Sequence, residues 1–261
     1  MKAFSNLLSD LILTSSRNRK LSLLAEYFRA TPDPDRGYAL GALTGSLNFK
    51  NIKASFFKEL IKEKQDAYLF DLSYDYVGDL AETVSLLWDQ KKEGDMPSLS
   101  FLFESLTKAK NEDLKSNIID ILDISTADQR WAFIKLFTGG LRIGVSSRLV
   151  KQALANYGNV DLEEIEKIWH GLHLPYIDLF SWLEKKGSKP KISIYDIFHP
   201  MMLAHPLVIE KDLTASNLDD FIAEYKWDGI RVQIVSHSKD VAFIQGLVMR
   251  FPSLFQRSLR Q

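Results

Sequence analysis

The sequence predicts an all-helical N-terminal domain, residues 1–185, followed by a linker at residues 186–197 and the start of an α/β domain with a mixed sheet. Two observations predict this division. Apolar residues in the first part recur every three or four positions, as on amphipathic helices, and strand signals are scarce there. From residue 192 the pattern changes to short β-prone runs, at residues 222–225, 231–235 and 241–243.

Apolar spacing and turn residues place the helices in order. The first predicted helix covers residues 3–13, and residues 31–37, rich in Pro and Asp, predict a turn. Residues 73–83 are expected to form a turn followed by a helix that starts at Asp79. Thr126–Gln129 and Asp161–Glu164 have the spacing of capping boxes, which predict helices that run to Phe137 and His170. Further helices are expected near residues 21–28, 37–45, 52–63, 79–89, 98–109 and 112–123.

Composition narrows the class of protein. The chain has 261 residues and a net charge of -1, so any contact with an acidic partner must come from local patches. Cysteine is absent, which excludes disulfides and thiolate metal sites and fits a reducing compartment. No run approaches the ~18 apolar residues of a membrane span, so we expect a cytoplasmic protein without a signal peptide or membrane contact. His170 and His173 could suggest a metal pair, but no third ligand is nearby, so no metal site is expected.

A chemically suggestive pattern lies in residues 224–233, where an apolar run leads into Lys-x-Asp-Gly-x-Arg. The amine of Lys226 can act as a nucleophile if its surroundings lower its pKa. Asp228 can orient this amine, Gly229 permits a tight turn, and Arg231 can hold ribose or phosphate oxygens. The same four positions also fit an exposed hairpin with a surface Lys–Asp pair.

A second pattern is the glycine-rich stretch at residues 138–150, with Gly139, Gly140 and Gly144 close together. Glycines let a backbone approach a partner closely, and Arg142 and Arg148 bring positive charge. Ser146 or Ser147 can cap the following helix, whose N-terminus can meet a phosphate. Taken alone, the pattern favours a purely structural helix–loop–helix connection. The basic segment 17–20 is a weaker candidate, because charge runs are usually solvated surface.

Several of these segments together resemble bacterial ATP-dependent DNA ligases with a helical N-terminal DNA-binding domain. The resemblance rests on residues 224–233, on residues 198–207 at the entry to the catalytic domain, and on the loop at residues 140–146. Residues 78–82 and 169–172 also match family segments. The resemblance implies that residues 1–185 bind DNA and that residues 198–261 are the N-terminal fragment of an adenylation (nucleotidyltransferase) domain.

The resemblance also implies roles for individual residues. Lys226 would attack ATP, with Mg²⁺ as the metal, to form lysyl-AMP. Glu224 would accept a hydrogen bond from the adenine amino group, and Arg231 would contact the ribose or the nick terminus, with Asp228 and Gly229 beside the nucleotide. The expected partner is nicked duplex DNA, bound by a monomer in repair, replication or recombination. The residues expected at the DNA are Gly140, Arg142, Gly144, Ser146 and Arg148.

The family pattern is incomplete here, because the rest of the adenylation domain and a C-terminal barrel have no counterpart. We therefore expect that this chain does not seal nicks alone. Residues 244–261 depart from the family, and one permitted codon set for residues 243–253, read one frame away, encodes the family-like string YTRASDEISF. A frameshift with a poorly packed tail is the expectation. The alternatives are a non-catalytic DNA-binding module left from such a gene, or a degraded gene product.

Overall fold

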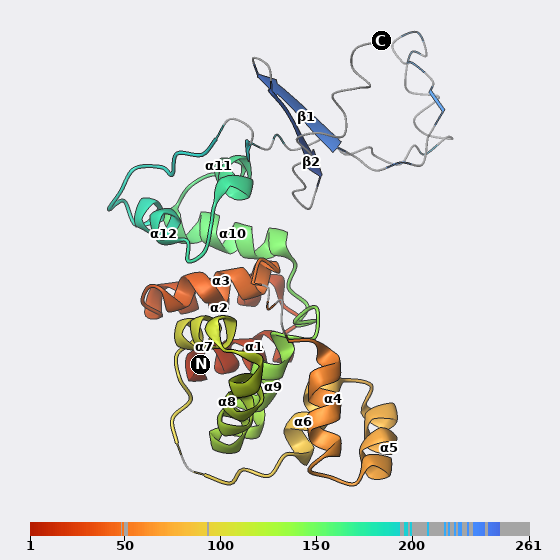
Figure 1. The fold of residues 1–261 in the computed structure, drawn as a ribbon. Helices are drawn as coiled ribbons and strands as arrows, with labels where there is room; N and C mark the ends of the chain where they lie inside the picture. The colour runs from red at the N-terminus through yellow and green to blue at the C-terminus, as the bar shows by residue number, and fades with distance from the viewer. Residues whose placement is uncertain are drawn as a thin grey trace. The chain divides into compact units, whose positions relative to one another are not determined.

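The computed structural model describes residues 1–47, 49, 52–92, 94–193, 196–197 and 199, and beyond them residues 208, 217, 219, 222, 224, 225, 229, 232–237 and 240–245. The chain forms two compact units. The first consists of residues 1–162 and 173–190, and the second of residues 163–172 and 191–261. Figure 1 labels the helices and strands along the chain.

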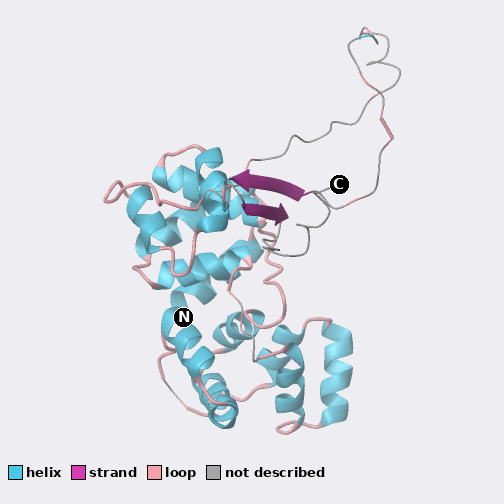
Figure 2. Ribbon diagram, turned by 45° about the horizontal axis from the view of Figure 1, so that its top comes forward, coloured by secondary structure: helices cyan, strands magenta, loops and turns pink. Residues whose placement is uncertain are grey.

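The first unit is built from helices and loops, as the colouring in Figure 2 shows. This confirms the expectation of an all-helical N-terminal region. Its helices are α1 (Lys2–Leu13), α2 (Arg17–Ala30), α3 (Asp35–Thr44), α4 (Ala54–Lys62), α5 (Ala67–Val77), α6 (Leu80–Leu87), α7 (Leu99–Lys108), α8 (Asn111–Ile124), α9 (Ala127–Lys135), α10 (Ser147–Gly158) and α12 (Ile177–Leu183).

Side-chain caps fix where many of these helices begin, because the first amides of a helix have no partner within it. The capping box predicted at Thr126 is present. The Thr126 hydroxyl accepts from the Gln129 amide at 3.4 Å, and the Gln129 side chain accepts from the Thr126 amide at 3.1 Å. The other N-cap residues whose side chains accept such bonds are Ser16, Asp66, Asp79, Ser98 and Ser146.

Aromatic side chains fill much of the core of this unit. Phe57 of α4 lies with its ring centroid 5.3 Å from that of Phe137, and Phe137 lies 5.1 Å from Phe133 of α9. Phe28 of α2 and Phe180 of α12 form a second contact, at 5.5 Å. Burial of such side chains is the main stabilising contribution, and it joins helices that are far apart in sequence.

One helix approaches the backbone of another segment so closely that only glycine fits. A Cβ atom at Gly37 of α3 would lie 1.6 Å from the carbonyl oxygen of Pro175. A Cβ at Gly41, one turn later, would lie 2.7 Å from a methyl group of Leu174, which is a side chain and can move. The packing of α3 against residue 175 therefore requires glycine at position 37.

A buried ion pair network joins the ends of several helices in the first unit. The Arg36 guanidinium donates to Asp33, at 2.7 and 2.8 Å, and to Glu184. Tyr157 donates to the same Glu184 carboxylate at 2.6 Å. The hydrogen bond from Arg36 is the main reason why the pKa of Glu184 falls from 4.5 to about 2. The network thus links α3, α10 and the end of α12.

Helix α5 was not expected, and residues 73–77, predicted as part of a turn, belong to it. The helix ends at Gly78, whose φ of 73° is left-handed, and α6 then starts after Asp79 as predicted. Of the α5 side chains only Phe70 is buried. The helix packs on α4 and α6 at the side of the unit seen in Figure 1.

The second unit contains α11 (Leu162–Ile168), which starts at the last residue of the first unit, the short 3₁₀ helix η1 (Trp169–Gly171), β1 (Val232–His237) and β2 (Asp240–Gln245). The two strands pair antiparallel, from Val232 opposite Gln245 to His237 opposite Asp240. Strands were predicted at residues 231–235 and 241–243, and the observed ones are longer. The strand expected at residues 222–225 is not formed by Ile222, Glu224 or Tyr225.

Two strands do not establish an α/β domain, so that assignment and the predicted domain boundaries stay predictions. Ile244 and Gln245 belong to β2, whereas residues 246–261 lie outside the described residues, so the expected poorly packed tail also stays a prediction. Within the described part of the chain, no helix is long and apolar enough to cross a lipid bilayer. Nor do the described residues include a group of three or more His, Asp or Glu side chains that could hold a metal ion.

Candidate nucleic-acid interface

The glycine-rich segment at residues 138–146, called the glycine loop below, connects α9 to α10 and has an unusual backbone. Gly139 and Gly144 have φ angles of 81° and 66°, in the left-handed region. Arg142 has a φ of 52°, although this region costs a residue with a side chain about 1–2 kcal/mol. Residues with such strain cluster at binding and active sites, so Arg142 is a candidate functional residue.

The glycine loop is anchored at its centre and exposed on both sides. Ile143 is buried, and the neighbouring Arg142 and Gly144 are exposed. Gly140, Ser146 and Arg148 are exposed as well, so all five residues predicted to meet DNA lie on the surface. Arg142 makes no hydrogen bond or ion pair with the residues that the structure describes.

Lys20 of α2 holds the loop from beneath. Its Nζ donates hydrogen bonds to the carbonyl oxygens of Gly144, at 2.9 Å, and Ile143, at 3.3 Å. The side chain is buried, and a Cβ atom at residue 144 would lie only 2.6 Å from Nζ. Sequence analysis missed this residue, because it belongs to a basic run interpreted as solvated and its partners lie more than a hundred positions away.

The N-termini of α2 and α10 lie side by side at this point. Ser16 caps α2 by accepting from the Arg19 amide at 3.3 Å, and Ser146 caps α10 by accepting from the Leu149 amide at 3.2 Å. Both ends line one open groove of about 560 Å³, together with Arg17 and Lys20. Helix N-termini and cationic side chains both favour anions, so this groove is suited to phosphate groups.

A second groove, of about 590 Å³, is lined by Arg142 and by residues of α1, α6 and α9. A buried ion pair between Lys135 and Asp79 forms part of its wall. Although burial alone would raise it, the pKa of Asp79 lies below its ordinary value, because Lys135 and the Glu82 amide donate to its carboxylate. The positive charge of Lys135 is thereby compensated by Asp79. Arg142 is the cation in the lining of this groove that has no ion pair among the described residues.

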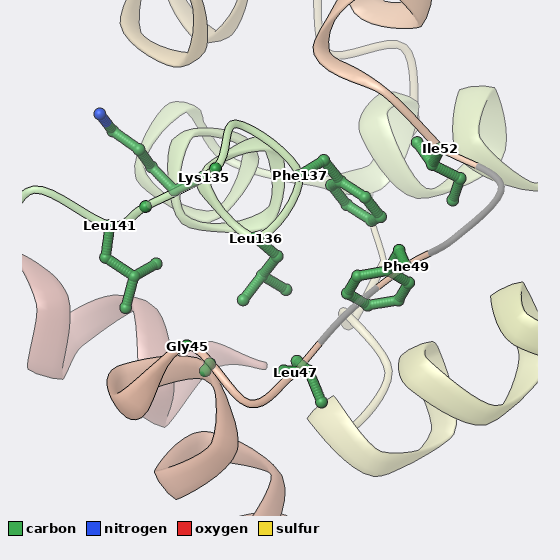
Figure 3. A pocket seen from close by; sticks show the side chains of 11 residues that line it. Gly45, Leu47, Phe49, Ile52, Lys135, Leu136, Phe137 and Leu141 are labelled. Carbon is green, nitrogen blue, oxygen red and sulfur yellow. The ribbon is translucent and has the colours of Figure 1, made fainter. Parts of the chain in front are cut away.

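A partly open pocket of about 250 Å³, with mostly apolar lining residues, lies behind the first half of the glycine loop, where Gly139, Gly140 and Leu141 form one wall. Figure 3 shows Phe49 and Leu136 pointing into it, whereas the amine of Lys135 is directed away. Phe49 and Phe137 lie with ring centroids 4.3 Å apart. The loop is therefore supported by packed atoms only in part.

The predicted nucleotide site lies mostly outside the described residues, so it stays a prediction. Glu224 and Gly229 are exposed, and Lys226, Asp228 and Arg231 lie outside the described residues. Strand β1, which follows these residues in the sequence, is hydrogen-bonded to residues 197 and 199. The Gln233 side chain accepts from the His199 amide at 2.9 Å and donates to the Ile197 carbonyl at 3.0 Å.

The helical part of the chain matches a known family. The family model described as DNA ligase N terminus matches residues 1–155. This chain belongs to the DNA ligase N-terminal family. The predicted relationship to ATP-dependent DNA ligases is thereby confirmed for the N-terminal region. The matched range includes Lys20, the glycine loop and Arg148, and it excludes residues 224–231.

Two curated relatives are also DNA ligases. A probable DNA ligase of Koribacter versatilis (strain Ellin345) is 24% identical over 236 residues, which cover 84% of this chain and 40% of that protein. A DNA ligase of Nitrosopumilus maritimus (strain SCM1) is 25% identical over 278 residues, which cover 94% of this chain and 46% of that protein. The chain thus spans less than half the length of these relatives.

Proposed function

We propose that this chain is the DNA-binding part of an ATP-dependent DNA ligase and that its glycine loop binds the sugar–phosphate backbone of nicked duplex DNA. The observation that carries the proposal is the construction of the loop. An exposed arginine without a described partner, Arg142, is held in a left-handed conformation, and Gly144 and Val145, which follow it, line a groove together with two capped helix N-termini. The match to the DNA ligase N-terminal family supports DNA as the anion.

The expected mode of binding follows from the groups in the loop. Arg142 and Arg148 supply charge, and the amides at the start of α2 and α10 supply donors for phosphate oxygens. Contacts of this kind position a protein on a duplex but do not read its sequence. Because the whole chain carries a net charge of -1, these local groups must supply the attraction. We therefore infer binding with little sequence preference and a marked dependence on salt.

For the second unit we propose the adenylation step that the resemblance implies. The Lys226 amine would attack the α-phosphate of ATP, pyrophosphate would leave, and lysyl-AMP would form. AMP would then pass to the 5′-phosphate at a nick, and the 3′-hydroxyl would displace it to seal the strand. Mg²⁺, carried by the nucleotide phosphates, supplies charge stabilisation in such a step. The support is the pattern around Lys226, with Glu224 and Gly229 accessible to solvent.

Titration of labelled nicked duplex with the full chain at several salt concentrations tests the DNA-binding proposal. Arg142→Ala should weaken binding and reduce the slope of log K against log salt by about 0.9, the contribution of one phosphate contact. Lys108→Ala removes an exposed charge at the end of α7 and should change neither quantity. If the two variants behave alike, the glycine loop does not contact DNA.

Incubation with α-labelled ATP and Mg²⁺ tests the adenylation proposal. A covalent adduct that is lost in Lys226→Ala supports it. Binding of nicked duplex without any adduct would instead identify the chain as a non-catalytic DNA-binding module.

A further inference from the structure

Lys20 is buried without the counter-charge that a buried cation normally has. The other deeply buried lysine of the first unit, Lys135, is paired with Asp79. Lys20 meets only the two carbonyl oxygens of Ile143 and Gly144, and it has no ion pair among the described residues. An unpaired buried charge is unfavourable for folding, so the presence of Lys20 is not explained by stability.

The two hydrogen bonds of Lys20 set the direction of two peptide groups. In a trans peptide the carbonyl and the N–H point to opposite sides. Because the carbonyls of Ile143 and Gly144 face Lys20, the N–H groups of Gly144 and Val145 face away from it. Neither N–H donates a hydrogen bond within the described part of the chain. Successive outward N–H groups of this kind form a concave site for anions.

We propose that Lys20 is a positioning residue for DNA binding, which turns the amides of Gly144 and Val145 outward and fixes the backbone that follows Arg142. The charge of Lys20 lies just behind these amides, in the groove that Arg17 and Ser146 also line. A DNA phosphate bound there would supply the missing counter-charge. This inference rests on the proposed function, because it assumes that the glycine loop meets DNA.

The positioning itself can be measured without DNA. In the full chain, ¹⁵N order parameters of residues 142–145 should be near the ~0.85 of rigid backbone and should fall below about 0.6 in Lys20→Met. Lys20→Arg keeps a cationic donor and should retain the rigid values. Phe70→Leu, in the core of α5, controls for a general loss of stability and should leave the loop unchanged. Unchanged order parameters in Lys20→Met overturn the inference.

A double-mutant cycle on nicked duplex tests the consequence for binding. Lys20→Met should weaken binding about tenfold and lower the salt slope by about one phosphate contact, as Arg142→Ala does. If Lys20 acts through the loop, Arg142→Ala should cost less than twofold more in the Lys20→Met background. Fully multiplicative effects, or wild-type binding by Lys20→Met while Arg142→Ala binds weakly, overturn the inference.

The two failures are distinguishable. A loop that loses order in Lys20→Met while Arg142→Ala and Lys20→Met both bind DNA normally contradicts the proposed function and leaves the positioning intact. An effect of Arg142→Ala alone contradicts only the role of Lys20. Gly144→Ala probes the contact between Lys20 and the loop from the loop side, because its Cβ would displace Nζ of Lys20. If Lys20→Met does not fold, Gly144→Ala should show the same loss of DNA binding.

Discussion

Replacing Arg142 with glycine should make the protein more stable and a poorer DNA binder at the same time. The left-handed φ of 52° costs an ordinary residue about 1–2 kcal/mol, whereas glycine adopts it without that strain. Glycine loses about 0.5–1 kcal/mol more chain entropy on folding, so the net gain is roughly 0.5–1 kcal/mol. With a urea m-value of about 2 kcal/mol per molar, the unfolding midpoint should rise by roughly 0.3 M.

The same substitution removes one cation from the proposed interface. One phosphate contact contributes about 0.9 to the salt slope, so binding at ~0.1 M salt should weaken about eightfold. Lys185→Gly is the matched control, because Lys185 is also exposed, cationic and left-handed, with a φ of 60°, but lies after α12. It should gain similar stability and bind DNA as the wild type does. A less stable Arg142→Gly protein would refute the argument from strain, and equal DNA affinity in the two variants would refute the role of the charge.

Three further results are expected from urea unfolding. The free energy of unfolding of Gly37→Ala should fall by about 3 kcal/mol or more, because its Cβ would overlap a backbone carbonyl oxygen. Gly41→Ala on the same helix should be within about 1 kcal/mol of the wild type. Similar unfolding midpoints for the two variants would contradict this expectation. The depressed pKa of Glu184 adds stability that is present above pH 4.5 and is lost as pH falls towards about 2. The decline in unfolding midpoint over this range should therefore be shallower in Glu184→Gln. Parallel pH profiles would show that Glu184 is not the group that causes this decline. Thr126→Ala should cost about 1 kcal/mol through loss of the capping box, and an unchanged midpoint would count against that cap.

Helices with one face in the core could be predicted from the sequence, because burial leaves a three- and four-residue apolar period. The caps at Thr126 and Asp79 could be predicted for a similar reason, since their hydrogen bonds are local. Helix α5 could not, because its large apolar side chains mostly face solvent. Tyr68 and Tyr76 are 72% and 93% exposed, and Leu69 and Leu72 are also exposed, so the pattern carried no information about a buried face.

The residues of the glycine loop that we propose to contact DNA could be chosen from residue types, but their geometry could not be predicted. Glycine at 139 and 144 permits a left-handed backbone, whereas nothing in the sequence indicates that Arg142 adopts one. The contact of Lys20 with residues 143 and 144 depends on how α2 packs against α10. This packing is tertiary structure, which local sequence patterns do not predict. A basic residue in a charged run is usually solvated, and only the assembled core removes this one from water.

The cavity behind the glycine loop gives its two halves different mechanical properties. From Ile143 onward the backbone is tied to Lys20 and to the start of α10, so pressure on this half is transmitted to packed helices. Behind Gly139–Leu141 lies a void of about 250 Å³, and closing part of it displaces no core atom. If the loop binds DNA as proposed, the first half can therefore yield to a groove of varying width, while the second half keeps its shape.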